Sequence, residues 1–383
     1  MATAATKVQM QIPILDLKAQ YETIREEIQE AIGRVLEKQH FILGPEVKAL
    51  EGEIAQYCGR KYGIGVASGT DALILGLKAC GIGPGDKVIV PSFSFIATAD
   101  AVSALGAEPV FADIDPETFN IDPSLIEPLI DSHTKAIVPV HLYGQAADMG
   151  PILALAKAHN LKVVEDAAQA LGASYEGRRA TALGDIGCIS FFPSKNLGAY
   201  GDGGMIVTDS EEIYRHLISL RAHGSAKKYF SEEQGWNSRL DELQAAILRV
   251  KLGYLDQWCS GRRAAADRYN QLLSGIPNVV LPVRDPRCEH VFHQYTIRVG
   301  NRDQVQKRLT EQGVSTMVYY PVPIHLQPIY SSLGTGPASL PRTEAACREV
   351  LSLPIFPELT KEQAEYVAEA LTLAISEQSR STR

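Results

Sequence analysis

Short apolar runs alternate with helical patterns through the first two thirds of this chain, and this alternation limits the fold more than any other feature. Residues 88–90, 136–142 and 162–166 have the length and composition of strands. Helical patterns lie between them, at residues 123–130 and 151–159. Strands and helices that alternate at this spacing predict an α/β fold, with helices on both faces of a largely parallel sheet.

The pattern changes after residue 240. Residues 241–258 form one long helical pattern, and shorter strands such as 295–299 and 316–318 then mix with helices. A chain of 383 residues exceeds the size at which a single core keeps growing. We therefore predict a large α/β domain with an N-terminal arm over residues 1–250 and a smaller α+β domain over residues 251–383.

Charge and cysteine content limit the partners of the protein. A net charge of -8 argues against nucleic acid or an anionic membrane surface as the main partner. The six cysteines are scattered without a CxxC pair or a histidine cluster, so we predict reduced thiols and no metal site. Residues 1–11 lack the pattern of a signal peptide, and no apolar run approaches the roughly 20 residues that span a bilayer. We expect a soluble, cytoplasmic protein.

Lys195 stands between an apolar run, residues 188–192, and a loop with four glycines at residues 198–204. Apolar neighbours desolvate an amine, which lowers its pKa and makes the nitrogen available as a nucleophile or base. A strand-to-loop corner from which lysine reaches solvent explains the same residues. The stretch alone does not separate these two interpretations.

Two further polar groups follow predicted strands. Residues 68–71, Ser-Gly-Thr-Asp, form a turn before a helix, where backbone amides bind anions, although for this turn taken alone an ordinary N-cap is the better explanation. Asp166 ends a strand at the edge where open α/β sheets bind ligands, and a helix cap is again the alternative. Together with Ser190 and Lys195, these groups suit pyridoxal phosphate, which needs a lysine, a carboxylate and a phosphate cradle.

Several motifs in order resemble the DegT family of sugar-nucleotide aminotransferases. They are residues 68–73 (SGTDAL), 91–98 (PSFSFIAT), 165–169 (EDAAQ), 192–198 (FPSKNLG) and 237–245 (NSRLDELQA). The resemblance extends from about residue 14 to the last helix. It implies the fold type I aminotransferase architecture, with a mostly parallel seven-stranded sheet and a smaller C-terminal domain, and pyridoxal 5'-phosphate as cofactor.

The resemblance also implies a role for individual residues in holding this cofactor. Lys195 would bind it as a Schiff base and later carry a proton between the substrate carbon and the cofactor. Asp166 would pair with the pyridine nitrogen and Gln169 would reach the ring hydroxyl. The remaining contacts are implied as follows: Phe93 stacks on the ring, and Gly69, Thr70 and Ser190 hold the phosphate.

Further implied residues concern a second subunit and the substrate. Asn237 would complete the phosphate site from the partner subunit, so the resemblance implies a homodimer with shared active sites. Arg239 would contact an acidic group of the substrate across the same interface. Tyr319, Tyr320 and His325 match a segment that borders the sugar site in the family, while core packing is the alternative for the tyrosines.

The substrate branch follows from details of the lysine loop. Family members that dehydrate sugars carry histidine in place of Lys195. Lysine followed by Asn-Leu-Gly, and then by Gly-Asp-Gly-Gly at residues 201–204, resembles enzymes that act on 3-oxo sugars. The resemblance therefore implies transamination from an amino acid, with glutamate expected, to C3 of a UDP- or dTDP-linked 3-oxo sugar. Amination at C4, and a non-catalytic regulatory protein of the same fold, are the alternatives.

Overall fold

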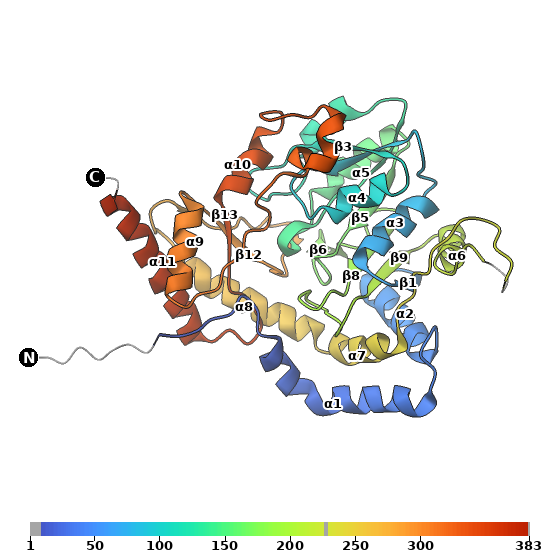
Figure 1. The fold of residues 1–383 in the computed structure, drawn as a ribbon, viewed down its shortest axis with the longest axis horizontal. Coiled ribbons are helices and arrows are strands. Elements are labelled where there is room, and N and C mark those ends of the chain that lie inside the picture. The colour runs from blue at the N-terminus through green and yellow to red at the C-terminus, as the bar shows by residue number, and fades with distance from the viewer. Residues whose placement is uncertain (1–8, 226–228, 382–383) are drawn as a thin grey trace, which may run out of the picture.

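A seven-stranded sheet forms the centre of the computed structural model, which describes residues 9–225 and 229–381 (Figure 1). The spatial order is β1-β9-β8-β5-β4-β2-β3, and β9 alone runs antiparallel to its neighbours. The strands are β1 (Tyr62–Val66), β2 (Lys87–Pro91), β3 (Glu108–Ala112), β4 (Thr134–Ile137), β5 (Lys162–Asp166), β8 (Ile186–Ser190) and β9 (Gly204–Thr208). The predicted α/β class and the mostly parallel seven-stranded sheet are confirmed.

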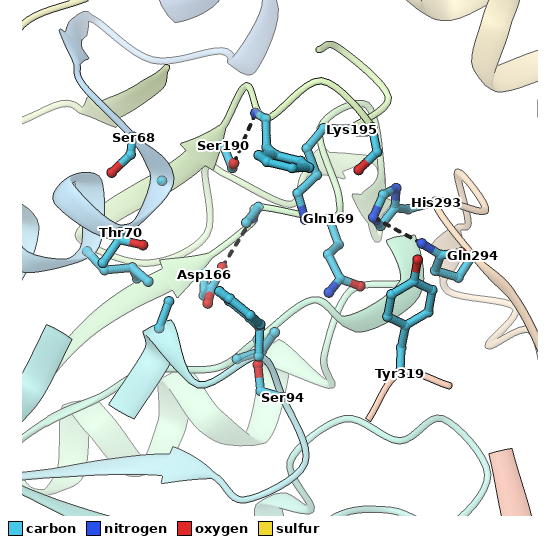
Figure 2. A pocket seen from close by; sticks show the side chains of 18 of the residues that line it. Ser68, Thr70, Ser94, Asp166, Gln169, Ser190, Lys195, His293, Gln294 and Tyr319 are labelled. Atoms are coloured by element: carbon cyan, nitrogen blue, oxygen red, sulfur yellow. Dashed lines mark hydrogen bonds between the residues drawn. The ribbon is translucent and has the colours of Figure 1, made fainter. Parts of the chain in front are cut away.

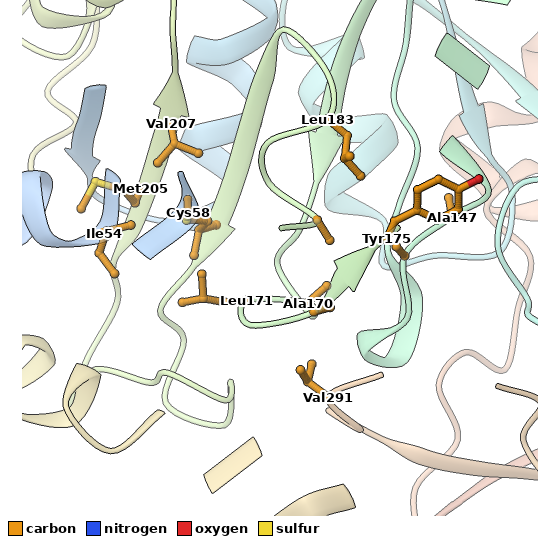
Figure 3. Close-up of a cluster of buried hydrophobic side chains, with 14 of the residues drawn as sticks. Ile54, Cys58, Ala147, Ala170, Leu171, Tyr175, Leu183, Met205, Val207 and Val291 are labelled. Carbon is orange, nitrogen blue, oxygen red and sulfur yellow. The ribbon is translucent and has the colours of Figure 1, made fainter. Parts of the chain in front are cut away.

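Helices cover both faces of this sheet because its strands are apolar on both sides. In β2, Val88 and Val90 face one core while Ile89 faces the other. One face packs against α3 (Gly69–Ala79), α4 (Ala97–Ser103) and α6 (Glu211–Leu220). The other packs against α2 (Pro45–Cys58) and α5 (Met149–Ala158), and Figure 3 shows part of that core around Ile54, Leu171 and Val207.

Two predicted elements differ from the structure, and proline accounts for both. Residues 123–130 form two 3-10 turns, η1 (Pro123–Leu125) and η2 (Glu127–Leu129), each of which begins at or beside a proline. The strand expected at residues 136–142 ends at Ile137, two residues before Pro139, and is followed by η3 (Leu142–Gly144). The Pro139 carbonyl still accepts from the backbone amide of Asp166 at 2.9 Å, so the chain stays beside β5.

The helix expected over residues 241–258 is interrupted. It divides into α7 (Glu242–Leu252) and α8 (Leu255–Leu273), with Gly253 as the C-cap of α7. Helix α8 joins two parts of the molecule, because Leu255 and Cys259 pack into the core of the large sheet while Ala266 and Tyr269 pack into a separate C-terminal core.

The C-terminal core surrounds a small antiparallel sheet, β10 (Val279–Val280), β12 (Tyr295–Val299) and β13 (Val350–Leu353). Its helices are α9 (Arg302–Glu311), α10 (Pro341–Glu349) and α11 (Lys361–Ser381), with η4 (Ile324–Leu326) and η5 (Pro328–Leu333) between them. The expected strand at residues 316–318 is reduced to a single bridge between Met317 and Ser352. The boundary at residue 250 stays a prediction.

The N-terminal arm contacts both parts of the molecule. Ile12 is buried in the C-terminal core and pairs in parallel with Val314, and its amide donates to Gly313 O at 2.8 Å. Helix α1 (Leu17–Lys38) then runs against α7 along the lower edge of Figure 1. Most of the segment for which no signal peptide is predicted, residues 1–11, lies outside the described residues.

A third sheet of two-residue strands, β11 (Cys288–Glu289), β6 (Ser174–Tyr175) and β7 (Arg178–Arg179), links the two parts of the chain. None of the helices within the described ranges is long and apolar enough to cross a membrane. No group of three or more metal-ligating side chains occurs in the same ranges.

Candidate active site

A cavity of about 360 Å³ opens at the carboxyl edge of the large sheet (Figure 2). Parallel strands end at a common edge, so residues that follow different strands in the sequence meet there. The predicted residues that line the cavity are Gly69, Thr70, Asp166, Gln169, Ser190, Lys195, Tyr319 and Tyr320. The topology thus brings together groups that are up to 251 positions apart in the sequence, between Gly69 and Tyr320.

The corner between β1 and α3 is suited to an anion. Ser68 caps α3, and its Oγ accepts from the Asp71 amide at 3.1 Å; Gly69 and Thr70, which begin this helix, line the cavity. A Cβ on Gly69 would lie 2.6 Å from the Ser190 Cβ, which means that glycine is required for this approach. The hydroxyls of Thr70 and Ser190 line the same corner.

Asp166 is buried at the end of β5, where two donors orient its carboxylate. Thr98 Oγ1 donates to Oδ2 at 2.8 Å, and the Ala168 amide donates to Oδ1 at 3.2 Å. Thr98 also contacts Ser94, with 3.1 Å between the two hydroxyl oxygens. These two hydrogen bonds hold the Asp166 carboxylate in one orientation at the wall of the cavity.

The Lys195 amine points into the cavity from the loop after β8 (Figure 2). Burial of this amine lowers the pKa of Lys195 to about 8, although the charge of Asp166 acts in the opposite direction. Within residues 9–225 and 229–381, no side chain or carbonyl forms a hydrogen bond or an ion pair with its Nζ. An amine without a protein partner, in a cavity that also holds a carboxylate, is available for bonding to a ligand.

Gln169 is held on both sides of its amide. Its Oε1 accepts from the Tyr143 amide at 2.8 Å, and its Nε2 donates to the Tyr320 hydroxyl at 3.0 Å. Burial, followed by the charge of Asp166, raises the pKa of Tyr320, so its hydroxyl stays protonated. The second N–H of Gln169 remains available for a ligand oxygen.

The structure contradicts the assignment of ring stacking to Phe93. Its side chain is 1% exposed and packs among Phe119, Tyr143 and Tyr320, outside the cavity lining. Phe95, two residues later, is 56% exposed and does line the cavity. The chain turns after Pro91, so the sequence did not indicate which of the two phenylalanines faces a ligand.

His325 also lies away from the cavity, contrary to the prediction that it borders the sugar site. It is 1% exposed, and its Nδ1 lies 2.6 Å from the Ser92 hydroxyl in the wall behind the site. Asn237 and Arg239 do not line the cavity of their own chain either, although Ser238 between them is bound to Asp71. Their expected contribution from a second subunit stays a prediction.

Several lining residues were not anticipated from the sequence. His293 and Gln294 follow β11 and enter the cavity beside Tyr319 (Figure 2). Burial, and then the charge of Lys195, holds the pKa of His293 well below its ordinary range, so the imidazole is neutral. Nothing in the surrounding sequence of His293 suggests a site, because only the packing of the C-terminal part brings it there.

Comparison with known proteins identifies the family to which this chain belongs. The model of the DegT/DnrJ/EryC1/StrS aminotransferase family matches residues 22–372. The chain belongs to this family. Its membership classes the protein with aminotransferases, as the resemblance implied.

Similar proteins agree over almost the whole chain. A "Pleiotropic regulatory protein" of Geobacillus stearothermophilus is 52% identical, covering 94% of this chain and 98% of that protein. A UDP-N-acetyl-3-dehydro-alpha-D-glucosamine 3-aminotransferase of Acidithiobacillus ferrooxidans is 49% identical, covering 93% and 96%. The crystal structure of DesV from S. venezuelae in complex with a ketimine intermediate has a TM-score of 0.93 and 48% identity, covering 95% of this chain and 98% of that one.

Proposed function

We propose that this protein transfers an amino group, with pyridoxal 5'-phosphate as cofactor, from L-glutamate to C3 of a UDP- or dTDP-linked 3-oxo sugar. The observation that carries the proposal is the cavity in which the amine of Lys195, the carboxylate of Asp166 and the N-terminal corner of α3 face one another. The products would be amino sugars for surface glycans or secondary metabolites.

The residues of the cavity fit this cofactor. The α3 corner offers backbone amides and the hydroxyls of Thr70 and Ser190 to a phosphate, and the close approach of Gly69 to Ser190 leaves no room there for a larger side chain. Asp166 supplies the negative charge that a protonated pyridine nitrogen needs. Phe95 replaces Phe93 in our proposal as the aromatic side chain that faces the ring.

When bound, pyridoxal phosphate would supply an electron sink and an aldehyde carbon that can accept an amino group. Lys195 would hold the cofactor through its amine and would move the proton at the substrate carbon. With a pKa of about 8, about one lysine in ten is neutral at pH 7, compared with about one in three thousand at an ordinary lysine pKa. Desolvation of the cavity thus prepares Lys195 for both tasks.

The surrounding residues keep the reacting groups in place. Thr98 and the Ala168 amide fix the Asp166 carboxylate, and Tyr320 and the Tyr143 amide fix Gln169. Tyr319 and Tyr320 line the same cavity as Lys195, and in this proposal they contact the sugar. Each residue holds its orientation before a ligand enters, which reduces the entropy lost on binding.

The principal test uses the purified protein with pyridoxal phosphate. We expect the visible absorbance of the lysine-bound cofactor in the wild type and its absence in Lys195→Ala. Stopped-flow addition of glutamate should convert the wild type to its amine-loaded form, which should then aminate a 3-oxo sugar nucleotide faster than a 4-oxo one, as NMR of the product can show. A colourless wild type that takes up no cofactor would contradict the proposal.

The family and the A. ferrooxidans relative support a nucleotide sugar, and Arg239 offers a way to narrow it further. If the guanidinium of Arg239 from the partner subunit binds a uronate carboxylate, Arg239→Ala should reduce kcat/KM for a uronic substrate by about 10²-fold. The neutral 6-deoxy counterpart should lose much less. Equal losses for the two sugars would remove this role from Arg239.

A regulatory function is the second candidate, because the G. stearothermophilus relative carries the name of a regulatory protein. A regulator of this fold would bind the cofactor without turning over. The stopped-flow half-reaction with glutamate separates the two functions: cofactor binding with no reaction would favour regulation, and a complete half-reaction would favour catalysis.

A further inference from the structure

A buried lysine, Lys251, lies beneath the loop that carries Lys195. Lys251, near the C-terminal end of α7, is 1% exposed, and its Nζ donates to the carbonyl oxygen of Gly198. The amine also lies over two aromatic rings, 4.9 Å from the ring centre of Tyr200 and 5.9 Å from that of Trp258. No carboxylate forms an ion pair with it in the part of the chain that the structure describes.

Burial of an ammonium without a counter-charge is costly, and an apolar side chain of similar volume would fill this space without the cost. The Gly198 carbonyl, the two rings and the C-terminal end of α7 offset part of it, since all three present negative potential to the amine. Among the described residues, the one hydrogen bond of the Lys251 amine is with the Gly198 carbonyl. Lys251 therefore acts on the loop that contains Gly198 and Lys195.

The loop is a closed turn with Lys195 inside it. The Lys195 amide donates to Phe192 O at 2.9 Å, and the Ala199 amide donates to Phe191 O at 2.8 Å. A Cβ on Gly198 would lie 2.2 Å from Pro193 O, so the turn folds tightly onto its own backbone. The position of Gly198 consequently fixes the position of Lys195.

Helix α7 holds this turn at two points. Gln244 Oε1 accepts from the Tyr200 amide at 2.8 Å, and Lys251, two turns further along the helix, binds Gly198. Both contacts join α7 to the backbone just after Lys195, and neither side chain lines the cavity. Lys251 can act on the reaction through the loop alone.

We propose that Lys251 is a positioning residue, which holds the turn at residues 192–200 through Gly198 so that the Lys195 amine is directed at the carbon that reacts. The proposal deepens the transaminase function and rests on it for the role of Lys195. The hydrogen bond from Lys251 to Gly198 is present in the apoprotein, so its effect on the turn can be measured without cofactor.

Three variants separate positioning from general stability. Lys251→Met keeps the volume and removes the donor. Lys251→Gln keeps a donor that is one bond shorter, so it should restore part of the contact. Arg249→Gln is the matched control, because Arg249 lies on the same helix but binds Glu46 and Glu53 on α2, away from the turn.

The first measurement is hydrogen exchange of the apoprotein. Lys251→Met should speed exchange at the amides of Lys195, Ala199 and Tyr200 by about tenfold or more, Lys251→Gln by about threefold, and Arg249→Gln by less than that. Peptides of α11 should be unchanged in all three. If Lys251→Met does not fold, the contrast between Lys251→Gln and Arg249→Gln decides.

The second measurement is spectroscopic and uses the cofactor-loaded protein. Lys251→Met should weaken pyridoxal phosphate binding by about tenfold and shift the pH at which the visible absorbance changes, with partial recovery in Lys251→Gln. Wild-type rates of exchange in the loop, or an unchanged pH midpoint and affinity in Lys251→Met, would overturn the proposal. A wild type that takes up no cofactor would instead contradict the transaminase function, and the exchange data would still report on the turn.

Discussion

Lys195 is partly exposed in the cavity and Lys251 is buried, so their surroundings differ although desolvation lowers the pKa of both to about 8. The Lys195 amine faces a cavity that it shares with the Asp166 carboxylate, and no protein group binds it among the described residues. The Lys251 amine is enclosed by protein, donates to Gly198 and lies over two rings. The Lys195 amine can therefore bind a ligand, whereas the Lys251 amine is already bonded to Gly198.

The comparison shows what a lowered pKa does and does not indicate. Desolvation acts on both amines alike, so the acidity of a lysine does not by itself identify a catalytic residue. The difference lies in access: Lys195 can bond to a ligand, whereas Lys251 would first have to leave its carbonyl. The two lysines are nevertheless connected, because Gly198 belongs to the turn that carries Lys195.

The largest expected difference between Lys195 and Lys251 is the loss of transamination rate when each is replaced. Lys195→Ala should reduce transamination by at least about 10³-fold, since it removes both the bonding amine and the proton carrier. Lys251→Met should reduce it by about 10-fold, because its effect is indirect. Single-turnover rates with glutamate measure both. Equal losses would mean that Lys251 is as close to the chemistry as Lys195.

Removal of the Asp166 carboxylate should change the pKa of Lys195 and leave the pKa of Lys251 unchanged. Asp166 raises the pKa of Lys195 against the effect of burial, so Asp166→Asn should lower that pKa below about 8 and reduce kcat by about 10²-fold. Amine modification across a pH series, followed by mass spectrometry of each lysine peptide, reports both pKa values. A shift at Lys251 would indicate a structural change rather than loss of a charge.

Stability should depend on pH through Lys251 in a defined direction. Its pKa falls from the ordinary lysine value to about 8 on folding, so the unfolded chain binds more protons between about pH 8 and 10.5. The folded state therefore bears a cost of about 3 kcal/mol below pH 8, which disappears as the pH rises to about 10.5.

Lys251→Met removes this titration. Its free energy of unfolding relative to the wild type should thus fall by about 3 kcal/mol between pH 8 and 10.5, as denaturant titrations at each pH can measure. Arg249→Gln is the control, and it should keep the wild-type slope. A constant difference between Lys251→Met and the wild type would show that the ammonium is not desolvated.

The smallest expected effect concerns the ring over Lys251. Tyr200→Leu removes a cation–π contact and should lower the free energy of unfolding by about 1 kcal/mol while the pKa of Lys195 stays the same. Tyr200→Phe keeps the ring and should lie close to the wild type. Equal losses in the two variants would assign the effect to the tyrosine hydroxyl.

The sequence predicted that the polar side chains at the ends of strands lie together at one edge of the sheet. Asp166, Ser190 and the turn at residues 68–70 end strands of a parallel sheet, and the order of strands and helices brings such ends to one edge. Lys195 follows directly after one of them. Their shared location could be inferred because it depends on topology, which apolar periodicity encodes.

Residues outside regular strands were less predictable. Phe93 and Phe95 stand in the same motif, yet one is buried and the other lines the cavity, because the backbone turns between them. His325 lies behind the cavity and His293 in it, although both come from the C-terminal part of the chain. Side-chain direction in irregular segments depends on tertiary contacts that a linear pattern does not contain.

The sequence by itself determined the α/β architecture, the family and the lysine, carboxylate and glycine turn of the site, since these depend on local periodicity and motif order. Tertiary structure decided that Phe95, and not Phe93, lines the cavity. It also decided that Lys251 forms a hydrogen bond with the loop that carries Lys195. The contact between Lys251 and Gly198 joins residues 53 positions apart, and it exists only because α7 packs beneath the sheet edge. Its physical basis is a single hydrogen bond in a desolvated core, which no local pattern records.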